Sequence, residues 1–317
     1  MPYTNFAQLN EAMIEHFQNK RYPEALKLIL EEGGHFPDDR MDVDYWKMVS
    51  AARIDDRQTV YAVARALLAD GLWFGEFLLR QSPSFASLQG DPEFEHIVAE
   101  SQAAQIRDMP SEPVVITKFP SQQPETSPLL VALHGNQSSA EKTLPFWEAA
   151  VSEGWNVAIP QSNQAMQKGA LGWDGSEASF TYVRERFDAF DFAFDPKRVV
   201  IAGHSMGGFV AIRMALEGML PVCGFIVIGP AVPYLDEEES LPGILSLARA
   251  RSVRACFIVG EKDDDIFIPK VIELGEKITA AGIACQVEMV PNATHDHSPA
   301  YDGALVRGLK FLMNGKQ

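Results

Sequence analysis

Six short apolar runs, each followed by a polar loop, constrain the fold of the C-terminal two-thirds of the chain more than any other feature. The runs are nearly continuous and rich in valine and isoleucine, which is typical of strands buried on both faces of a parallel sheet. Because helical stretches separate most of them, they predict an α/β fold with a doubly wound, mostly parallel sheet. The expected strands cover residues 128–135, 156–160, 198–203, 224–229, 255–260 and 285–290, and the expected helices cover 142–153, 178–193, 206–217, 269–281 and 299–313.

The first 108 residues follow a different pattern, with apolar residues at helical spacing throughout. Helix pairs recur at roughly 35 residues, near the period of tetratricopeptide repeats, and the segment RYPEAL resembles the start of a second helix in such a repeat. We therefore expect a small all-helical, tetratricopeptide-like domain over 1–108. Its expected role is packing or the formation of a homodimer, with peptide binding as an alternative. A stretch rich in proline and serine follows, and the second domain should cover 109–317.

Charge and segment composition narrow the expected partners and location. The 317 residues include 27 basic and 43 acidic side chains, a net charge of −16. This charge repels phosphate backbones and anionic lipid, so we expect neither nucleic acid nor a membrane as a partner. No apolar run is long enough for a membrane span, and the first residues do not resemble a secretory signal. Cys223, Cys256 and Cys285 lie in strand-like runs, which favours reduced core cysteines in a cytoplasmic protein.

The segment Gly203-His204-Ser205-Met206-Gly207 matches the pattern G-x-S-x-G, directly after an expected strand and before an expected helix. In that context the serine lies on a sharp turn that needs small flanking residues. The N–H groups and the dipole of the following helix favour negative charge beside the serine. Ser205 is therefore the predicted nucleophile, and it needs a base, an orienting acid and donors for an oxyanion.

The loops after the last two expected strands contain the candidate base and acid. PNATHDHSPAYDG offers two histidines, and we prefer His295 to His297 for its distance from the strand end. FIVGEKDDD offers three consecutive aspartates, of which Asp263 has the expected spacing, with Asp264 and then Asp265 as alternatives. The acid must be buried and oriented, because it fixes the tautomer of the imidazole.

The order Ser205, Asp263, His295 is the order found in the α/β-hydrolase superfamily. With this order and the motifs LHGNQSS, GHSMGG, GEKDDD and NATHDH, residues 113–317 resemble a serine α/β-hydrolase. The nearest branches are the uncapped carboxylesterases, the phospholipase/carboxylesterases and the dienelactone hydrolases. The resemblance implies an oxyanion hole formed by the backbone N–H groups of Asn136 and Met206, with Gln137 as an alternative to Asn136.

The resemblance also implies the reaction, which is hydrolysis of soluble short- to medium-chain carboxylic esters through an acyl-serine intermediate. The segment 230–251 is too short for a large lid domain, which favours an open site and a small-molecule ester substrate. Trp173, Tyr234 and Phe267 are candidates for contact with the substrate. The sequence contains no Walker loop, H-E-x-x-H motif or C-x-x-C pair, so we expect no metal and no organic cofactor.

Two other classes of function fit parts of the same pattern. A thioesterase, a serine peptidase or a lactone hydrolase would use the same residues on the same fold. A helical-repeat binding protein with a degenerate hydrolase domain would not need them, and the intact Ser, Asp and His set disfavours this reading.

Overall fold

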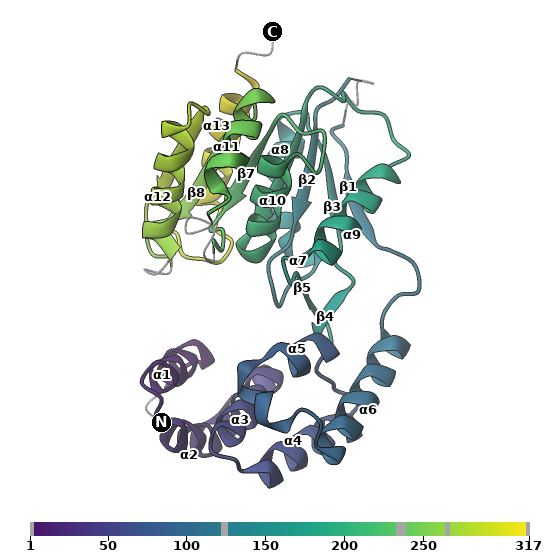
Figure 1. The fold of residues 1–317 in the computed structure, drawn as a ribbon, viewed down its shortest axis with the longest axis vertical. Coiled ribbons are helices and arrows are strands. Elements are labelled where there is room, and N and C mark those ends of the chain that lie inside the picture. Colours follow the sequence, from purple (N-terminus) through teal and green to yellow (C-terminus); the bar gives the residue numbers. More distant parts are fainter. Residues whose placement is uncertain (1–2, 122–125, 233–238, 264–266, 315–317) are drawn as a thin grey trace. The chain divides into compact units, whose positions relative to one another are not determined.

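The computed structural model describes residues 3–121, 126–232, 239–263 and 267–314 (Figure 1). The chain divides into two compact units. The first unit contains Met1–Met109 and the short segment Ala165–Gly169, and the second contains Pro110–Gln164 and Ala170–Gln317.

The first unit is all-helical, apart from its short segment from the second half of the chain. Its α-helices are α1 (Phe6–Gln18), α2 (Tyr22–Glu32), α3 (Arg40–Arg53), α4 (Arg57–Ala69), α5 (Glu76–Gln81) and α6 (Pro92–Asp108), with 3₁₀ turns η1 (Gly33–His35), η2 (Pro37–Asp39) and η3 (Pro83–Leu88). Asn5, Asp56 and Asp91 cap α1, α4 and α6 by accepting hydrogen bonds from the first free backbone N–H groups. α3 packs between α2 and α4, around a core that includes the fully buried Ile29 and Phe85. The likeness to tetratricopeptide repeats stays a prediction.

A hairpin that the sequence did not indicate contributes to this unit. Strands β4 (Gln164–Gln167) and β5 (Ala170–Gly172) pair with each other, and residues 165–169 group with the helices. The Gly75 N–H donates to the carbonyl of Met166 at 2.7 Å, and the Lys168 N–H donates to the carbonyl of Trp73 at 3.0 Å. The side chain of Lys168 also forms an ion pair with Asp108, at 3.2 Å.

The second unit is built on a seven-stranded sheet with the order β1-β3-β2-β6-β7-β8-β9. Every neighbouring pair is parallel except β1 with β3 at the edge, which confirms the mostly parallel sheet expected from the sequence. The strands are β1 (Val115–Lys118), β2 (Leu129–Leu133), β3 (Asn156–Pro160), β6 (Val199–His204), β7 (Gly224–Ile228), β8 (Arg254–Gly260) and β9 (Cys285–Val290).

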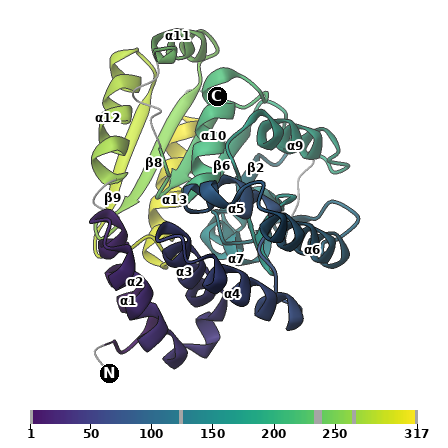
Figure 2. The ribbon, with the colours of Figure 1, turned by 60° about the horizontal axis from the view of Figure 1, so that its bottom comes forward.

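The central strands β2, β3, β6, β7 and β8 are buried on both faces, as their near-continuous apolar runs require. The edge strand β9 exposes Val287 and Met289, so the expectation of burial on both faces is wrong for this strand. In β2, Leu129, Val131 and Leu133 enter one core and Leu130 and Ala132 enter the other, because successive side chains point to opposite faces. Helices α9 (Glu177–Asp188), α10 (Ser205–Glu217), α11 (Leu241–Ala250) and α12 (Phe267–Ala280) supply the first core, whereas α7 (Ala140–Thr143), η4 (Leu144–Phe146), α8 (Glu148–Ser152) and α13 (Ala300–Met313) lie along the second (Figures 1 and 2).

Two expected helices differ in extent from the observed ones. The single helix expected over 142–153 is instead divided into α7, η4 and α8, with Pro145 in the middle turn. Proline has no N–H to donate, and its ring clashes with the preceding turn, so the helix does not continue through it. The helix expected over 178–193 ends at Asp188, and the aromatic residues that follow it pack against the first core instead.

Candidate functional site

Ser205 lies at the junction of β6 and α10, in a backbone conformation that a serine rarely adopts. Its φ is 51°, so the turn is left-handed at this residue. A Cβ on Gly203 would lie 2.3 Å from the carbonyl carbon of Gly207, and a Cβ on Gly207 would lie 2.3 Å from the carbonyl oxygen of His134. Both motif glycines are therefore needed for the close crossing of strand and helix. The strained turn at a polar residue is typical of a functional position.

His295 and Asp263 meet in the loops that follow β9 and β8. The Nδ1 atom of His295 lies 2.8 Å from Oδ1 of Asp263. The carboxylate only accepts hydrogen bonds when ionised, so Nδ1 carries the proton and Nε2 is left as the basic nitrogen. The side chain of Asp263 is 3% exposed and that of His295 is 41% exposed. A buried acid thus holds an imidazole that reaches solvent.

Of the alternative residues for the base and the acid, the structure describes only His297. The ring of His297 stands edge-on to Phe146, with centroids 5.0 Å apart, and the residue is exposed. Asp264 and Asp265 lie outside the described residues. The contact with the Asp263 carboxylate belongs to His295.

Three glycines at the carboxyl ends of neighbouring strands make room for these loops. A Cβ on Gly229, after β7, would lie 2.7 Å from Oδ2 of Asp263 and 3.1 Å from Nδ1 of His295. A Cβ on Gly260, at the end of β8, would lie 2.4 Å from the carbonyl oxygen of Ala293. Gly203 at the end of β6 is the third. The sequence indicates this feature, because four of the six apolar runs end in glycine, these three among them.

The loop after β2 approaches the same turn. A Cβ on Gly135 would lie 3.1 Å from the Cβ of Ser205, so the next residue, Asn136, lies near the turn at Ser205. Asn136 is exposed, and its side-chain Oδ1 accepts a hydrogen bond from the Trp173 N–H at 2.8 Å. Gln137 has a φ of 55°, so the loop turns sharply there. Met206 is in the first turn of α10, where backbone N–H groups have no partner within the helix.

Buried groups hold this loop in place. His134 is fully buried, and burial lowers its pKa to about 4, so the ring is neutral at pH 7. Its Nδ1–H donates to the carbonyl of Gly135 at 2.8 Å, and its Nε2 accepts from the Ser162 N–H at 3.1 Å. The indole N–H of Trp173 donates to the carbonyl of His134 at 2.9 Å.

The three candidates for substrate contact have different positions. Trp173 is 1% exposed and both of its N–H groups bind the loop at 134–136, so it supports that loop and does not form an accessible wall. This corrects the expectation for Trp173. Tyr234 lies outside the described residues. Phe267 is the first residue of α12.

Two residues of this region were not identified from the sequence as parts of the site. His204, beside Ser205, places Nε2 2.9 Å from the carbonyl oxygen of His295 and stacks on Phe146. Tyr301, in α13, is fully buried and donates its hydroxyl to the carbonyl of Thr294. Burial, with the nearby Asp263 charge, raises the pKa of Tyr301 to about 12, so the hydroxyl stays a donor. No local pattern marks a tyrosine on the last helix as a partner of a loop.

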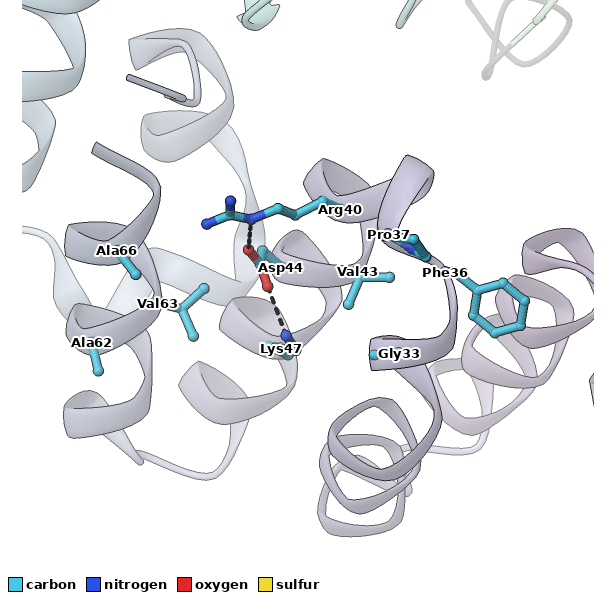
Figure 3. Close-up of a pocket in the computed structure, with 11 residues that line it drawn as sticks. Gly33, Phe36, Pro37, Arg40, Val43, Asp44, Lys47, Ala62, Val63 and Ala66 are labelled. Atoms are coloured by element: carbon cyan, nitrogen blue, oxygen red, sulfur yellow. Dashed lines mark hydrogen bonds and ion pairs between the residues drawn. The ribbon is translucent and has the colours of Figure 1, made fainter. Parts of the chain in front are cut away.

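The helical unit contains a separate pocket of about 480 Å³ (Figure 3). Arg40 and Lys47 both point toward the carboxylate of Asp44, at 3.4 and 2.8 Å. Arg40 also pairs with Asp70, so the charges beside the pocket balance. Its other walls are apolar, and they contain no nucleophile and no base. This pocket therefore does not offer the nucleophile and base that hydrolysis by a serine needs, and the predicted ones, Ser205 and His295, both lie in the second unit.

Two other features are absent from the described ranges. Among these residues, no three His, Cys, Asp or Glu side chains gather so as to hold a metal ion. Within the same ranges, no helix is long and apolar enough to cross a bilayer.

Comparison with known proteins agrees with this geometry at the level of the fold. Residues 130–255 match a sequence model of the Alpha/beta hydrolase family. An uncharacterized protein from Bacillus cereus superposes with a TM-score of 0.54 at 21% identity, over 99% of this chain and 100% of that one. The S-formylglutathione hydrolase of Staphylococcus aureus, an apoenzyme, superposes with a TM-score of 0.48 at 18% identity, over 64% of this chain and 93% of that one.

One curated protein shares sequence over part of its length. A probable 1-acylglycerol-3-phosphate O-acyltransferase from Oryza sativa subsp. japonica is 28% identical over 150 residues. The match covers 44% of this chain and 34% of that protein, so this chain spans about a third of the relative.

Proposed function

Since the second unit has the α/β-hydrolase fold, preceded by a helical domain, we propose that this protein is a serine carboxylesterase. The observation that carries the proposal is the 2.8 Å contact of His295 with the buried Asp263, beside the strained turn of Ser205. The substrate class is soluble esters with short- or medium-chain acyl groups.

In the proposed mechanism Nε2 of His295 removes the proton of Ser205, and Oγ attacks the ester carbonyl. The backbone N–H groups of Asn136 and Met206 donate to the oxyanion, which is worth about 3 kcal/mol of barrier for each donor. Asp263 holds the tautomer and stabilises the imidazolium. His295 then protonates the leaving alcohol, and water activated by the same nitrogen releases the acid. The reaction needs no metal and no organic cofactor.

The rice relative supports a second candidate on the same site. An acyl-serine intermediate is released by water in an esterase, and by an alcohol in an acyltransferase. The two activities share every step up to the acyl-enzyme, so the same residues serve both. Product analysis with and without an added glycerol-type acceptor distinguishes them, because transfer forms a new ester and hydrolysis forms free acid.

Ser205→Ala tests the function. We expect activity on p-nitrophenyl esters of short acyl chains to fall by about 10³-fold or more, because the covalent intermediate no longer forms. Thioesters, aminoacyl amides and lactones, assayed in parallel, rank the alternatives within the hydrolases. Equal turnover of every substrate by the wild type and by Ser205→Ala would refute the nucleophile. No turnover of any substrate by either protein would leave the helical-repeat binding protein as the better interpretation.

A further inference from the structure

The residue before the nucleophile contacts the loop that carries the base. Nε2 of His204 lies 2.9 Å from the backbone carbonyl oxygen of His295, and the two imidazole centroids are 4.7 Å apart. A carbonyl oxygen only accepts hydrogen bonds, so Nε2 of His204 carries the proton and donates it. The bond joins two segments that are far apart in the sequence, the turn after β6 and the loop after β9.

Two further contacts hold the ring of His204 in one orientation. On one side it stacks on Phe146, with centroids 4.4 Å apart and an interplanar angle of 24°. On another side its Nδ1 faces Gly135, where an added Cβ would lie 3.1 Å away. The ring is therefore fixed by the loop after β2, by Phe146 of η4 and by the base loop together.

We propose that His204 is a positioning residue, whose Nε2–H holds the backbone of His295 so that the imidazole stays aligned between Asp263 and Ser205. The inference rests on the proposed function of the same site. The side chain of His295 is 41% exposed, so packing alone does not restrain it. The Asp263 contact restrains the ring, and the His204 contact restrains the backbone.

A neutral imidazole at position 204 is suited to donate a hydrogen bond beside His295. Burial, followed by the neighbouring His295 ring, lowers the pKa of His204 to about 4. The titratable groups that face it are His295, Asp263 and His297. When His295 takes the proton of the nucleophile, His204 therefore adds no second positive charge beside the imidazolium.

Two variants distinguish the effect of the His204 hydrogen bond from the effect of its packing against Phe146. His204→Phe keeps a flat ring against Phe146 and removes the donor, whereas His204→Gln keeps an N–H at a similar reach. We expect kcat of His204→Phe to fall by about 5- to 10-fold, which is the effect of one lost neutral hydrogen bond, with KM within about 2-fold of the wild type. His204→Gln should recover most of kcat.

The decisive readout is the proton between His295 and Asp263, observed by NMR in the free enzyme as a far-downfield resonance. In His204→Phe this resonance should broaden or move upfield, and in His204→Gln it should stay near the wild-type position. A wild-type resonance and a wild-type kcat in a folded His204→Phe protein would overturn the proposal. If His204→Phe does not fold, His204→Met, which also lacks the donor, takes its place.

The two proposals fail in different ways. The resonance is measured without substrate, so it tests the positioning of His295 whatever the enzyme hydrolyses. Loss of the resonance in His204→Phe, together with full activity of Ser205→Ala, would support the positioning role and refute the esterase.

Discussion

Because Gly229 has no side chain, the side chains of Asp263 and His295 can meet beside it. The φ of this residue is +49°, and a Cβ would fall 2.7 Å from the carboxylate of Asp263. The glycine therefore serves both the backbone turn after β7 and the contact between two side chains from other loops.

Gly229→Ala should reduce kcat by about 10-fold or more, because the added methyl group forces Asp263 and His295 apart. Gly243→Ala is the matched control, since a Cβ there meets nothing within 4 Å and lies in α11. We expect the control to keep full activity and to be slightly more stable. The test compares kcat and the urea midpoint of both variants, and equal kcat for the two would contradict the role given to Gly229.

Single substitutions also test which of the two histidines, His295 or His297, is the base. His295→Ala should lose activity by about 10³-fold or more, because the base is removed. His297→Ala should keep activity within a few-fold, because the contact of His297 is with the ring of Phe146. Steady-state assays on one p-nitrophenyl ester suffice, and the reverse ranking would move the base to His297.

At the scale of elements, the β4–β5 hairpin shows how a short segment depends on one glycine. The Gly75 N–H binds the Met166 carbonyl, and a Cβ on Gly75 would lie 1.7 Å from the carbonyl oxygen of Ala165. Both partners are backbone atoms, so neither rotates away. No other residue fits at position 75 while residues 165–169 keep these contacts.

Gly75→Ala should therefore lower the free energy of unfolding by about 2 kcal/mol or more, which is the usual effect of overpacking at a rigid site. It should also raise the rate of proteolysis within residues 165–169. Gly34→Ala is the control, because a Cβ on Gly34 meets nothing within 4 Å. Urea unfolding and limited proteolysis measure the difference, and identical behaviour of the two variants would count against the packing described.

At the scale of the whole molecule, acid should destabilise this protein before its carboxylates are protonated. His134 and His204 have pKa values lowered to about 4 by burial, against about 6.5 in an unfolded chain. Between those values the unfolded state binds more protons, so stability falls as the pH falls. The contribution is complete above about pH 6.5, and for the fully buried His134 it amounts to about 3 kcal/mol.

Urea unfolding at several values between pH 7 and pH 4.5 tests this expectation. The free energy of unfolding should decrease over that range, with a smaller decrease in His204→Gln, which has no group to titrate at that position. A free energy that does not change between pH 7 and pH 5 would show that the two histidines are not held neutral by the fold.

The strand–helix alternation and the sharp turn at Ser205 were determined by local sequence. Runs rich in valine and isoleucine suit only strands buried on both faces, and the glycines around Ser205 suit only a tight crossing. For the same reason the mostly parallel sheet followed from the sequence alone. The placement of Ser205 before a helix also needed no tertiary information, because every residue involved is within a few positions.

The partners of that turn were decided by the tertiary structure. Asp263, His295 and Gly229 follow three different strands, and only the order of those strands in the sheet brings them together. The same holds for Trp173, which sequence reasoning placed in a pocket wall and the fold buries behind the loop of Asn136. Contacts across the sheet have no fixed spacing along the chain. Local sequence therefore identified the candidate residues, and the tertiary packing determined which of them meet.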